Sequence, residues 1–325
     1  MHTGITAISS QLSFDGDTLN IKELNVVNGC QSLSTIFSCS ESVRNAIDAY
    51  VMFRFYEISD AEHADRISIS TNSQSAVKAR DLRSNDKAVL AMKKAYEQYY
   101  TDGYFITKRG EQPNAAKYNT THTVNLSDLG KQLIAWHSQR PTISYSETKI
   151  FDKYFDQLFH KDYAPQKVQA LHDLFTAVEE KWNKDKPMGL NDALLAMKAY
   201  APYHHLYAIS VIICELNKMP ESVPDPAATY DLLKKADLLD GVIDMAGNCL
   251  NSAFETASAE ANENGRIFSP QNWVKAKGSL KDIRSATRNN LNGMKMYPQG
   301  KQQLQILQEK LSLDKEMFEA RWTAD

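Results

Sequence analysis

The stretch Leu24-Asn25-Val26-Val27-Asn28-Gly29-Cys30-Gln31-Ser32-Leu33-Ser34-Thr35-Ile36-Phe37 decides how the N-terminal part of the chain folds. Its apolar start ends at Asn28-Gly29, and apolar residues at helical spacing follow at once, which predicts a strand, a tight turn and a helix. Gly29 allows a positive φ, and the N–H groups of a new helix attract anions. The turn is either a phosphate site, with donors from Gln31 and Ser32, or only a connection between two buried elements.

The composition is that of a soluble globular protein with room for two domains. The chain has 325 residues, of which 42% are hydrophobic and 24% charged. Its formal charge of −3 gives no general attraction to nucleic acid or membrane, so a polyanion site must come from a local cluster of basic residues. No apolar stretch reaches the roughly 18 residues of a membrane span, and no signal peptide is recognisable. We therefore expect no membrane partner.

The cysteine pattern indicates a reducing compartment. The four cysteines are widely spread and form no Cys-x-x-Cys pair, which argues against a disulfide scaffold or a zinc ribbon. We expect a cytoplasmic protein without a metal site. Cys30, beside the central turn, is either a nucleophile activated at a helix N-terminus or a small packing residue.

β-Forming residues surround the central turn. Segments 5–14 and 18–24 flank Asp15-Gly16-Asp17 and predict a hairpin, and segment 51–58 predicts a mostly buried strand. Asp60 is expected to cap a helix that runs to about Ser70. The first strand begins almost at Met1, so we expect this chain to be the downstream part of a longer protein.

Helical apolar spacing dominates from about residue 126 onward. We therefore predict an α/β domain over residues 1–125 and a helical domain over residues 126–325. The expected fold class is an α+β N-terminal domain, with a mixed sheet and helices, followed by an all-α C-terminal domain. The helices are expected at about 126–138, 146–159, 166–183, 190–200, 203–217, 227–239, 242–262, 270–286 and 302–321.

Two further segments carry polar and basic residues with little apolar content. The first, residues 71–86, includes Asn72, Gln74, Lys78, Arg80 and Arg83 and precedes a helix that runs to about residue 100. The second places Lys108 and Arg109 at the end of a short strand, and both can reach one ligand only if the strand has already ended. Each segment is either part of a binding site or a solvated loop.

Three other patterns favour structural roles. His204-His205 lie about 100° apart on an apolar helix, which is unsuitable for chelating one metal, so we expect packing or capping. Glu147-Thr-Lys149 and Glu179-Glu-Lys181 have the Glu-x-Lys spacing of metal nucleases but lie on predicted helical surfaces. We interpret these as solvated charges.

Taken together, these stretches resemble the abortive-infection phage-resistance (AIPR) family. The resemblance covers about the first half of the chain and thins out beyond Phe159. Ser32 stands where the family usually has Thr, and Thr3 where it usually has Asn. The segments that carry it are His2-Thr3-Gly4-Ile5-Thr6, Val27-Asn28-Gly29-Cys30-Gln31-Ser32, Thr71-Asn72-Ser73-Gln74, Val77-Lys78-Ala79-Arg80-Asp81-Leu82-Arg83, and Tyr104-Phe105 with Lys108-Arg109-Gly110-Glu111.

The central turn is also similar to a distant form of the Asp-Gly-Gln-x-Arg turn of ParB-like nucleotide-binding domains. Here Asn28 replaces the acid and no arginine follows Gln31, which weakens the expectation of hydrolysis. The resemblance implies a ParB-like mixed sheet that binds a nucleotide or phosphate, such as a nucleoside triphosphate with Mg²⁺.

The resemblance implies a phage-defence protein with a phosphate site built from three segments. The expected ligand-binding residues are Asn28, Gly29, Gln31, Ser32, Asn72, Gln74, Lys78, Arg80, Arg83, Lys108 and Arg109. The ligand is a nucleotide or a nucleic acid, and any catalysis would be phosphoryl chemistry. One alternative is a non-catalytic sensor or scaffold that binds a phage component. Another is a metal-dependent nuclease that uses residues upstream of this chain. The sequence leaves the oligomeric state open.

Overall fold

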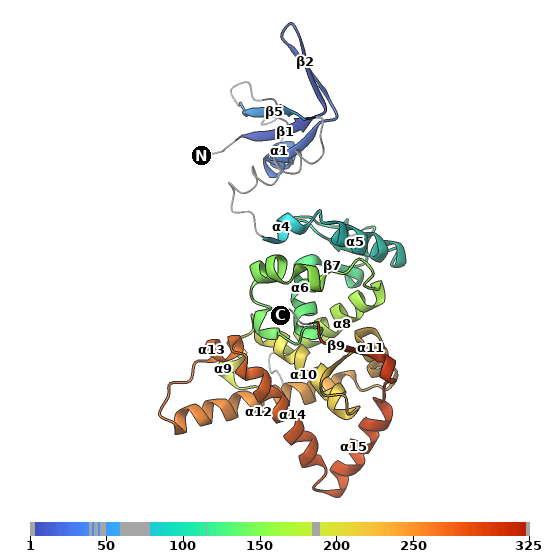
Figure 1. The fold of residues 1–325 in the computed structure, drawn as a ribbon, viewed down its shortest axis with the longest axis vertical. Coiled ribbons are helices and arrows are strands. Elements are labelled where there is room, and N and C mark those ends of the chain that lie inside the picture. Colours follow the sequence, from blue (N-terminus) through green and yellow to red (C-terminus); the bar gives the residue numbers. More distant parts are fainter. Residues whose placement is uncertain are drawn as a thin grey trace. The chain divides into compact units, whose positions relative to one another are not determined.

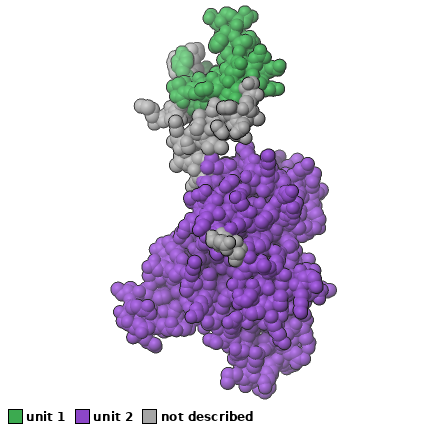
Figure 2. Space-filling view, viewed as in Figure 1, with its two compact units in different colours: residues 1–78 green, residues 79–325 purple. Residues whose placement is uncertain are grey.

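The fold was examined in a computed structural model, which describes residues 4–38, 41, 45, 50–58, 79–114, 116–183 and 189–322. The chain forms two compact units, residues 1–78 and 79–325 (Figure 2). Small sheets and helices make up the N-terminal part, and the C-terminal part is largely helical, which confirms the predicted fold class. The predicted division after residue 125 falls inside the second unit and stays a prediction as a domain boundary.

The first unit is built on a three-stranded mixed sheet. Its strand order is β4 (Asn25–Asn28), β1 (Ile5–Ser9) and β5 (Phe53–Glu57). β1 pairs antiparallel with β4 and parallel with β5, and as the middle strand it is buried along its whole length. The hairpin of β2 (Gln11–Asp15) and β3 (Thr18–Lys22) turns at Gly16, as predicted, whereas the strand expected over 5–14 is interrupted at Ser10.

The prediction of a mostly buried strand over 51–58 is wrong. β5 is an edge strand, and its residues are exposed or only half-buried. Phe53 and Tyr56 are 38% and 43% exposed. An apolar run predicts a strand but not its place in the sheet, and an edge strand has a neighbour on one side only. The helix expected over 60–70 lies outside the described residues.

The second unit begins with a small α/β portion (Figure 1). It contains α4 (Ala79–Arg83), α5 (Lys87–Tyr99), β6 (Tyr104–Ile106) and β7 (Thr123–Asn125). β6 and β7 pair in parallel. β7 continues directly into α6 (Leu126–Trp136), whose N-cap Asn125 accepts a hydrogen bond from the Ser127 N–H at 2.8 Å. This direct continuation joins the small sheet to the helical part.

The core of the second unit surrounds one apolar helix, α10 (Ala201–Leu216). All but one of its residues are buried, because it packs against four other helices (Figure 1). These are α6, α8 (Pro165–Trp182), α12 (Leu239–Glu263) and α14 (Gly278–Met294). A helix that is apolar all round belongs in the centre of a domain, and α10 follows this rule. The remaining helices are α7 (Phe155–Leu158), α9 (Asp192–Leu195), α11 (Pro226–Lys235), α13 (Pro270–Lys275) and α15 (Pro298–Lys310).

Four expected helices differ in the structure. The helix expected over 190–200 is only the short α9, and the helix expected over 270–286 is divided into α13 and α14, of which α14 continues to Met294. The helix expected over 146–159 consists of a π-helical segment, η3 (Lys149–Lys153), followed by the short α7. The helix expected over 302–321 ends at Lys310, and Phe318–Ala320 forms β9 instead, paired antiparallel with β8 (Ser222–Pro224). Pairing between segments so far apart in sequence cannot be read from local apolar spacing.

Candidate polyanion-binding site

The predicted strand, turn and helix at the central stretch are confirmed. β4 ends at Asn28, Gly29 has a φ of +92°, and α1 (Cys30–Ser38) begins directly after it. A Cβ at Gly29 would lie 2.8 Å from Cγ1 and 3.0 Å from Cα of Ile5. The glycine is therefore required by its positive φ and by the close approach of β1. At Asn28, Gln31 and Ser32 the structure describes only the backbone, so their ligand contacts stay a prediction.

Three of the predicted basic residues gather at α4. Arg83 donates from Nε to the Phe151 carbonyl oxygen at 3.1 Å, and its guanidinium lies 4.2 Å from the centre of the Phe155 ring. Arg109 Nη2 lies 3.9 Å from Asp81 Oδ2. Arg80 is only 7% exposed, and its Nε and Nη2 atoms have no hydrogen-bond partner among the described residues. Arg83 thus holds α4 on η3, whereas Arg80 remains a buried cation with unused donors.

The loop that carries Lys108 is fixed by Glu111. The Glu111 carboxylate accepts hydrogen bonds from the backbone N–H groups of Thr107 and Lys108, at 3.0 and 2.9 Å, and from the Tyr104 hydroxyl at 2.6 Å. Burial raises the pKa of Glu111, but these donors and Lys93 outweigh it and hold the pKa at about 2. β6 ends at Ile106, so Lys108 and Arg109 follow the strand rather than lie within it.

The other predicted binding residues, Asn72, Gln74 and Lys78, lie outside the described residues. The central turn belongs to the first unit, whereas α4 and the 107–111 loop belong to the second. A single phosphate site built from all three segments therefore stays a prediction.

The two histidines expected to have a structural role are in the core, whereas Lys181, interpreted as a solvated charge, is mostly buried and pairs with Asp240 and Asp244 at 3.3 and 2.9 Å. His204 and His205 are fully buried, and their rings contact the carbonyl oxygens of Tyr200 and Ile243 at 3.3 and 2.7 Å. Burial lowers the pKa of each histidine to about 4, despite these contacts. Both are neutral packing residues at pH 7, as the sequence predicts.

A strongly basic pocket lies in the second unit, between the end of α6, η3, the α13–α14 junction and the C-terminal segment. We call it the basic pocket; its volume is about 770 Å³. Eight of its 16 lining residues are lysine or arginine, and none is acidic. The cations are Arg140, Lys149, Lys153, Lys275, Lys277, Lys281, Arg284 and Arg321, and the other lining residues are Ser138, Gln139, Thr142, Ile143, Tyr145, Tyr154, Tyr207 and Leu280.

Arg284 is the best-anchored cation of the basic pocket. Its Nε donates to the Tyr207 hydroxyl at 2.7 Å, Nη1 to the Pro220 carbonyl at 2.8 Å and Nη2 to Gln139 Oε1 at 3.2 Å. All three acceptors are neutral, so these bonds fix the guanidinium without cancelling its charge. A positioned but uncompensated guanidinium suits the binding of phosphate or carboxylate.

Gln139, which accepts a hydrogen bond from Arg284, and the adjacent Ser138 lie in the lining of the basic pocket. Gln139 has a left-handed φ of +53° and donates from Nε2 to the Trp136 carbonyl at 2.7 Å and to Ser210 Oγ at 2.8 Å. Ser138 is 5% exposed, and within the described part of the chain its hydroxyl has no hydrogen-bond partner. Strained backbone and an unsatisfied buried hydroxyl at one place are features that a functional site explains.

The lysines lie farther out. Four of them, Lys149, Lys153, Lys277 and Lys281, are exposed, and Lys275 is half-buried. Among the described residues no carboxylate lies within ion-pair distance of any of these five; of the pocket arginines, Arg321 pairs with the exposed Glu221 at 2.7 Å. The pocket thus concentrates positive charge in a chain whose net charge is −3.

The basic pocket was not predicted from the sequence. Lys149 stood out there only as part of a Glu-x-Lys pattern, and in the structure the Glu147 carboxylate accepts a hydrogen bond from the Ser127 hydroxyl. A signal was present, since Lys275, Lys277, Lys281, Arg284 and Arg288 occur within 14 residues with one acid, Asp282, among them. A local count of charge would have found this half of the pocket, but not residues 138–153 across from it.

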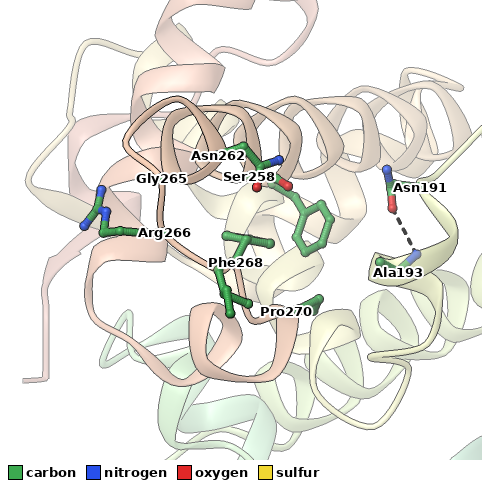
Figure 3. Close-up of a pocket in the computed structure, with 10 residues that line it drawn as sticks. Asn191, Ala193, Ser258, Asn262, Gly265, Arg266, Phe268 and Pro270 are labelled. Carbon is green, nitrogen blue, oxygen red and sulfur yellow. Dashed lines mark hydrogen bonds between the residues drawn. The ribbon is translucent and has the colours of Figure 1, made fainter.

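A second cavity, of about 580 Å³, lies near the end of α12 (Figure 3). Asn191 and Ala193 of the α9 region line one side of it, Phe268 lies just before α13, and Pro270 is the first residue of α13. Arg266 is the one charged residue in its lining. The lining also includes the apolar Phe254 and Ile267. With a single charged residue, this cavity lacks the positive charge that distinguishes the basic pocket.

The described residues contain neither a candidate metal cluster nor a candidate membrane-spanning helix. No cluster of three or more His, Cys, Asp or Glu side chains in the described part of the chain could hold a metal ion. None of the helices that the structure describes has the length and apolar character needed to cross a membrane.

Comparison with known proteins supplies the family. The family described as AIPR protein matches residues 1–265, which is most of the 325-residue chain. The chain therefore belongs to the AIPR family, as its motifs predict. Searches of curated proteins and of solved structures gave no match. The family match includes the half of the basic pocket formed by residues 138–153 and ends before the half formed by residues 275–284.

Proposed function

We propose that this AIPR-family protein acts in abortive-infection defence against phage, and that it does so by binding a phosphate-rich ligand, a nucleotide or a nucleic acid, in the basic pocket. The family membership supports the defence role. The observation that carries the binding role is a pocket with eight cations and no acidic lining residue.

The arrangement of the cations supports a phosphate-rich ligand. Buried or half-buried cations raise the free energy of a protein unless an anion compensates them. In the basic pocket the half-buried Arg284 is satisfied only by neutral oxygens, and the half-buried Lys275 has no carboxylate partner among the described residues. The four exposed lysines are hydrated, and they add to the positive potential of the pocket. A ligand that carries several phosphates would supply the missing negative charge and would release counterions on binding.

A second anion site near α4 is supported by Arg80. Its buried guanidinium has two unpartnered nitrogens, and Arg109 lies on the neighbouring Asp81. We propose that Arg80, Arg83, Lys108 and Arg109 bind a phosphate group at this place in the second unit. For the first unit we propose a separate phosphate contact at the turn of Asn28, Gly29, Gln31 and Ser32, and Asn72, Gln74 and Lys78 stay predicted ligand residues. A nucleoside triphosphate with Mg²⁺ is the proposed ligand there. Phosphoryl chemistry is the reaction that this site would support.

The test of the binding role compares two double variants with the same change of charge. K277E/K281E reverses two cations of the basic pocket, and K301E/K310E reverses two exposed lysines of α15 outside it. Binding of fluorescein-labelled oligonucleotides and nucleotides is measured by anisotropy, and phage plating is measured in cells. We expect K277E/K281E to lose at least tenfold in affinity and to lose protection, with K301E/K310E close to wild type.

Other outcomes would favour a different function. Full protection by K277E/K281E, with binding also retained, would contradict the proposal and favour a scaffold that binds a phage component. Loss of protection by Arg80→Ala alone, with the basic pocket intact, would place the function at the α4 site. Mg²⁺-dependent cleavage of DNA or RNA by a longer form of the protein only would favour a nuclease with upstream residues.

A further inference from the structure

We infer that the ligand of the basic pocket is a single-stranded nucleic acid, whose backbone follows the lysines while a base stacks on Tyr145. This inference rests on the proposed binding function and narrows it to one class of ligand. It depends on three features of the pocket: its aromatic side chains, the layout of its charges and its size.

The aromatic side chains lie beside the cations. Tyr145 is 40% exposed, and its ring meets Tyr200 edge to face, with 5.8 Å between ring centres. Lys275 Nζ lies 4.9 Å from the Tyr145 ring centre and 5.1 Å from that of Tyr200. An exposed aromatic ring, fixed by a second ring and adjacent to lysines, is the arrangement by which proteins bind single strands. A base in a duplex is already stacked and cannot use it.

The charges are layered in a way that suits a chain of phosphates. The guanidinium of Arg284 is held by three hydrogen bonds on the floor, whereas Lys149, Lys153, Lys277 and Lys281 are exposed at the rim. Fixed arginine forks select the geometry of one phosphate, whereas mobile lysine ammonium groups follow a backbone of any sequence. Arg284 and the five lysines together already carry more positive charge than one nucleoside triphosphate carries negative charge, which leaves the rim lysines for neighbouring phosphates.

The size of the pocket favours a single strand over a duplex. A volume of about 770 Å³ is that of a pocket for a small ligand, so it admits a short piece of one strand rather than the cross-section of a duplex. Ser138 lines the pocket, and its buried hydroxyl has no hydrogen-bond partner among the described residues. We therefore expect sequence-tolerant binding with a preference for unpaired bases.

The first experiment measures competition against a labelled 15-nucleotide oligo(dT) with the full chain. We expect unlabelled single-stranded DNA or RNA to compete at least tenfold better than a duplex of the same length, and far better than ATP, CTP or GTP. Equal competition by duplex or by a mononucleotide would overturn this inference and leave the proposed function standing. Absence of any binding would overturn both.

The second experiment tests Tyr145 as the stacking platform. Loss of one stacked base by Tyr145→Ala is expected to weaken oligonucleotide binding about tenfold, and Tyr145→Trp should restore it. The control is Tyr99→Ala, at a tyrosine that is 55% exposed on α5 outside the basic pocket, with unchanged binding expected. Melting temperatures of all variants exclude misfolding. Wild-type binding by the Tyr145→Ala variant would overturn the inference, as would a loss that the Trp variant does not restore.

Discussion

The salt dependence of oligonucleotide binding follows directly from the five lysines of the basic pocket. Each phosphate neutralised on a single strand contributes about −0.7 to the slope of log K against log salt concentration. Five lysines that each contact one phosphate therefore predict a slope of about −3.5. Between 50 and 200 mM salt the affinity should then fall by about 100-fold.

Replacing Lys149 and Lys281 by alanine removes one cation from each side of the pocket. The slope should become about −2.1, and the affinity should fall only about 20-fold over the same range of salt. The assay is fluorescence anisotropy with oligo(dT) at five or more salt concentrations. A wild-type slope between 0 and −1 would refute the reasoning, and so would a double variant with an unchanged slope, because both results mean that these lysines contact no phosphate.

Three further predictions concern the stability of the fold. K277E/K281E should raise the free energy of unfolding by about 0.5–1 kcal/mol at low salt, because it relieves repulsion among uncompensated cations; a lower melting temperature in differential scanning fluorimetry would contradict this. Acid should destabilise the protein between pH 6.5 and pH 4, because His204 and His205 bind protons in the unfolded state but stay neutral in the native state. The free energy of unfolding should fall by on the order of 2 kcal/mol per histidine, as measured by urea titrations across this pH range. Gly130→Ala should cost about 1–2 kcal/mol, despite the better helix propensity of alanine, because its Cβ would lie 2.9 Å from a buried side chain of η3; a variant as stable as wild type in urea would show that η3 can move aside.

The sequence predicted the helical half well, and the reason lies in α10. Its continuous apolar run, with Pro202 at the start, predicts a buried helix, and α10 is the centre of the core. The turn at Asn28-Gly29 was equally predictable from the sequence, because the glycine is required there by its positive φ. β5 and β9 were less readable. The exposure of β5 depends on its place at a sheet edge, and β9 depends on pairing with residues 222–224, about 95 residues earlier in the chain.

The residues of the candidate sites also differ in how well the sequence predicts them. Arg80, Arg83 and Arg109 were selected from local composition, and the structure brings them together around α4 through Asp81 and Phe151. The basic pocket could not be found from local composition, because its lining comes from separate segments near residues 140, 150, 207, 280 and 321. Only the 275–288 segment carries an excess of basic charge that is visible in the sequence. Spatial convergence of single lysines leaves no local motif.

A photo-crosslink tests directly whether a single-stranded nucleic acid binds in the basic pocket. An oligonucleotide with 4-thiothymidine at one position is bound to the full chain and irradiated, and the linked peptides are identified by mass spectrometry. We expect crosslinks in peptides that contain Tyr145 to Lys153 or Lys275 to Arg284, and we expect unlabelled single-stranded DNA to suppress them. Crosslinks confined to other parts of the chain, with none in these two segments, would contradict it.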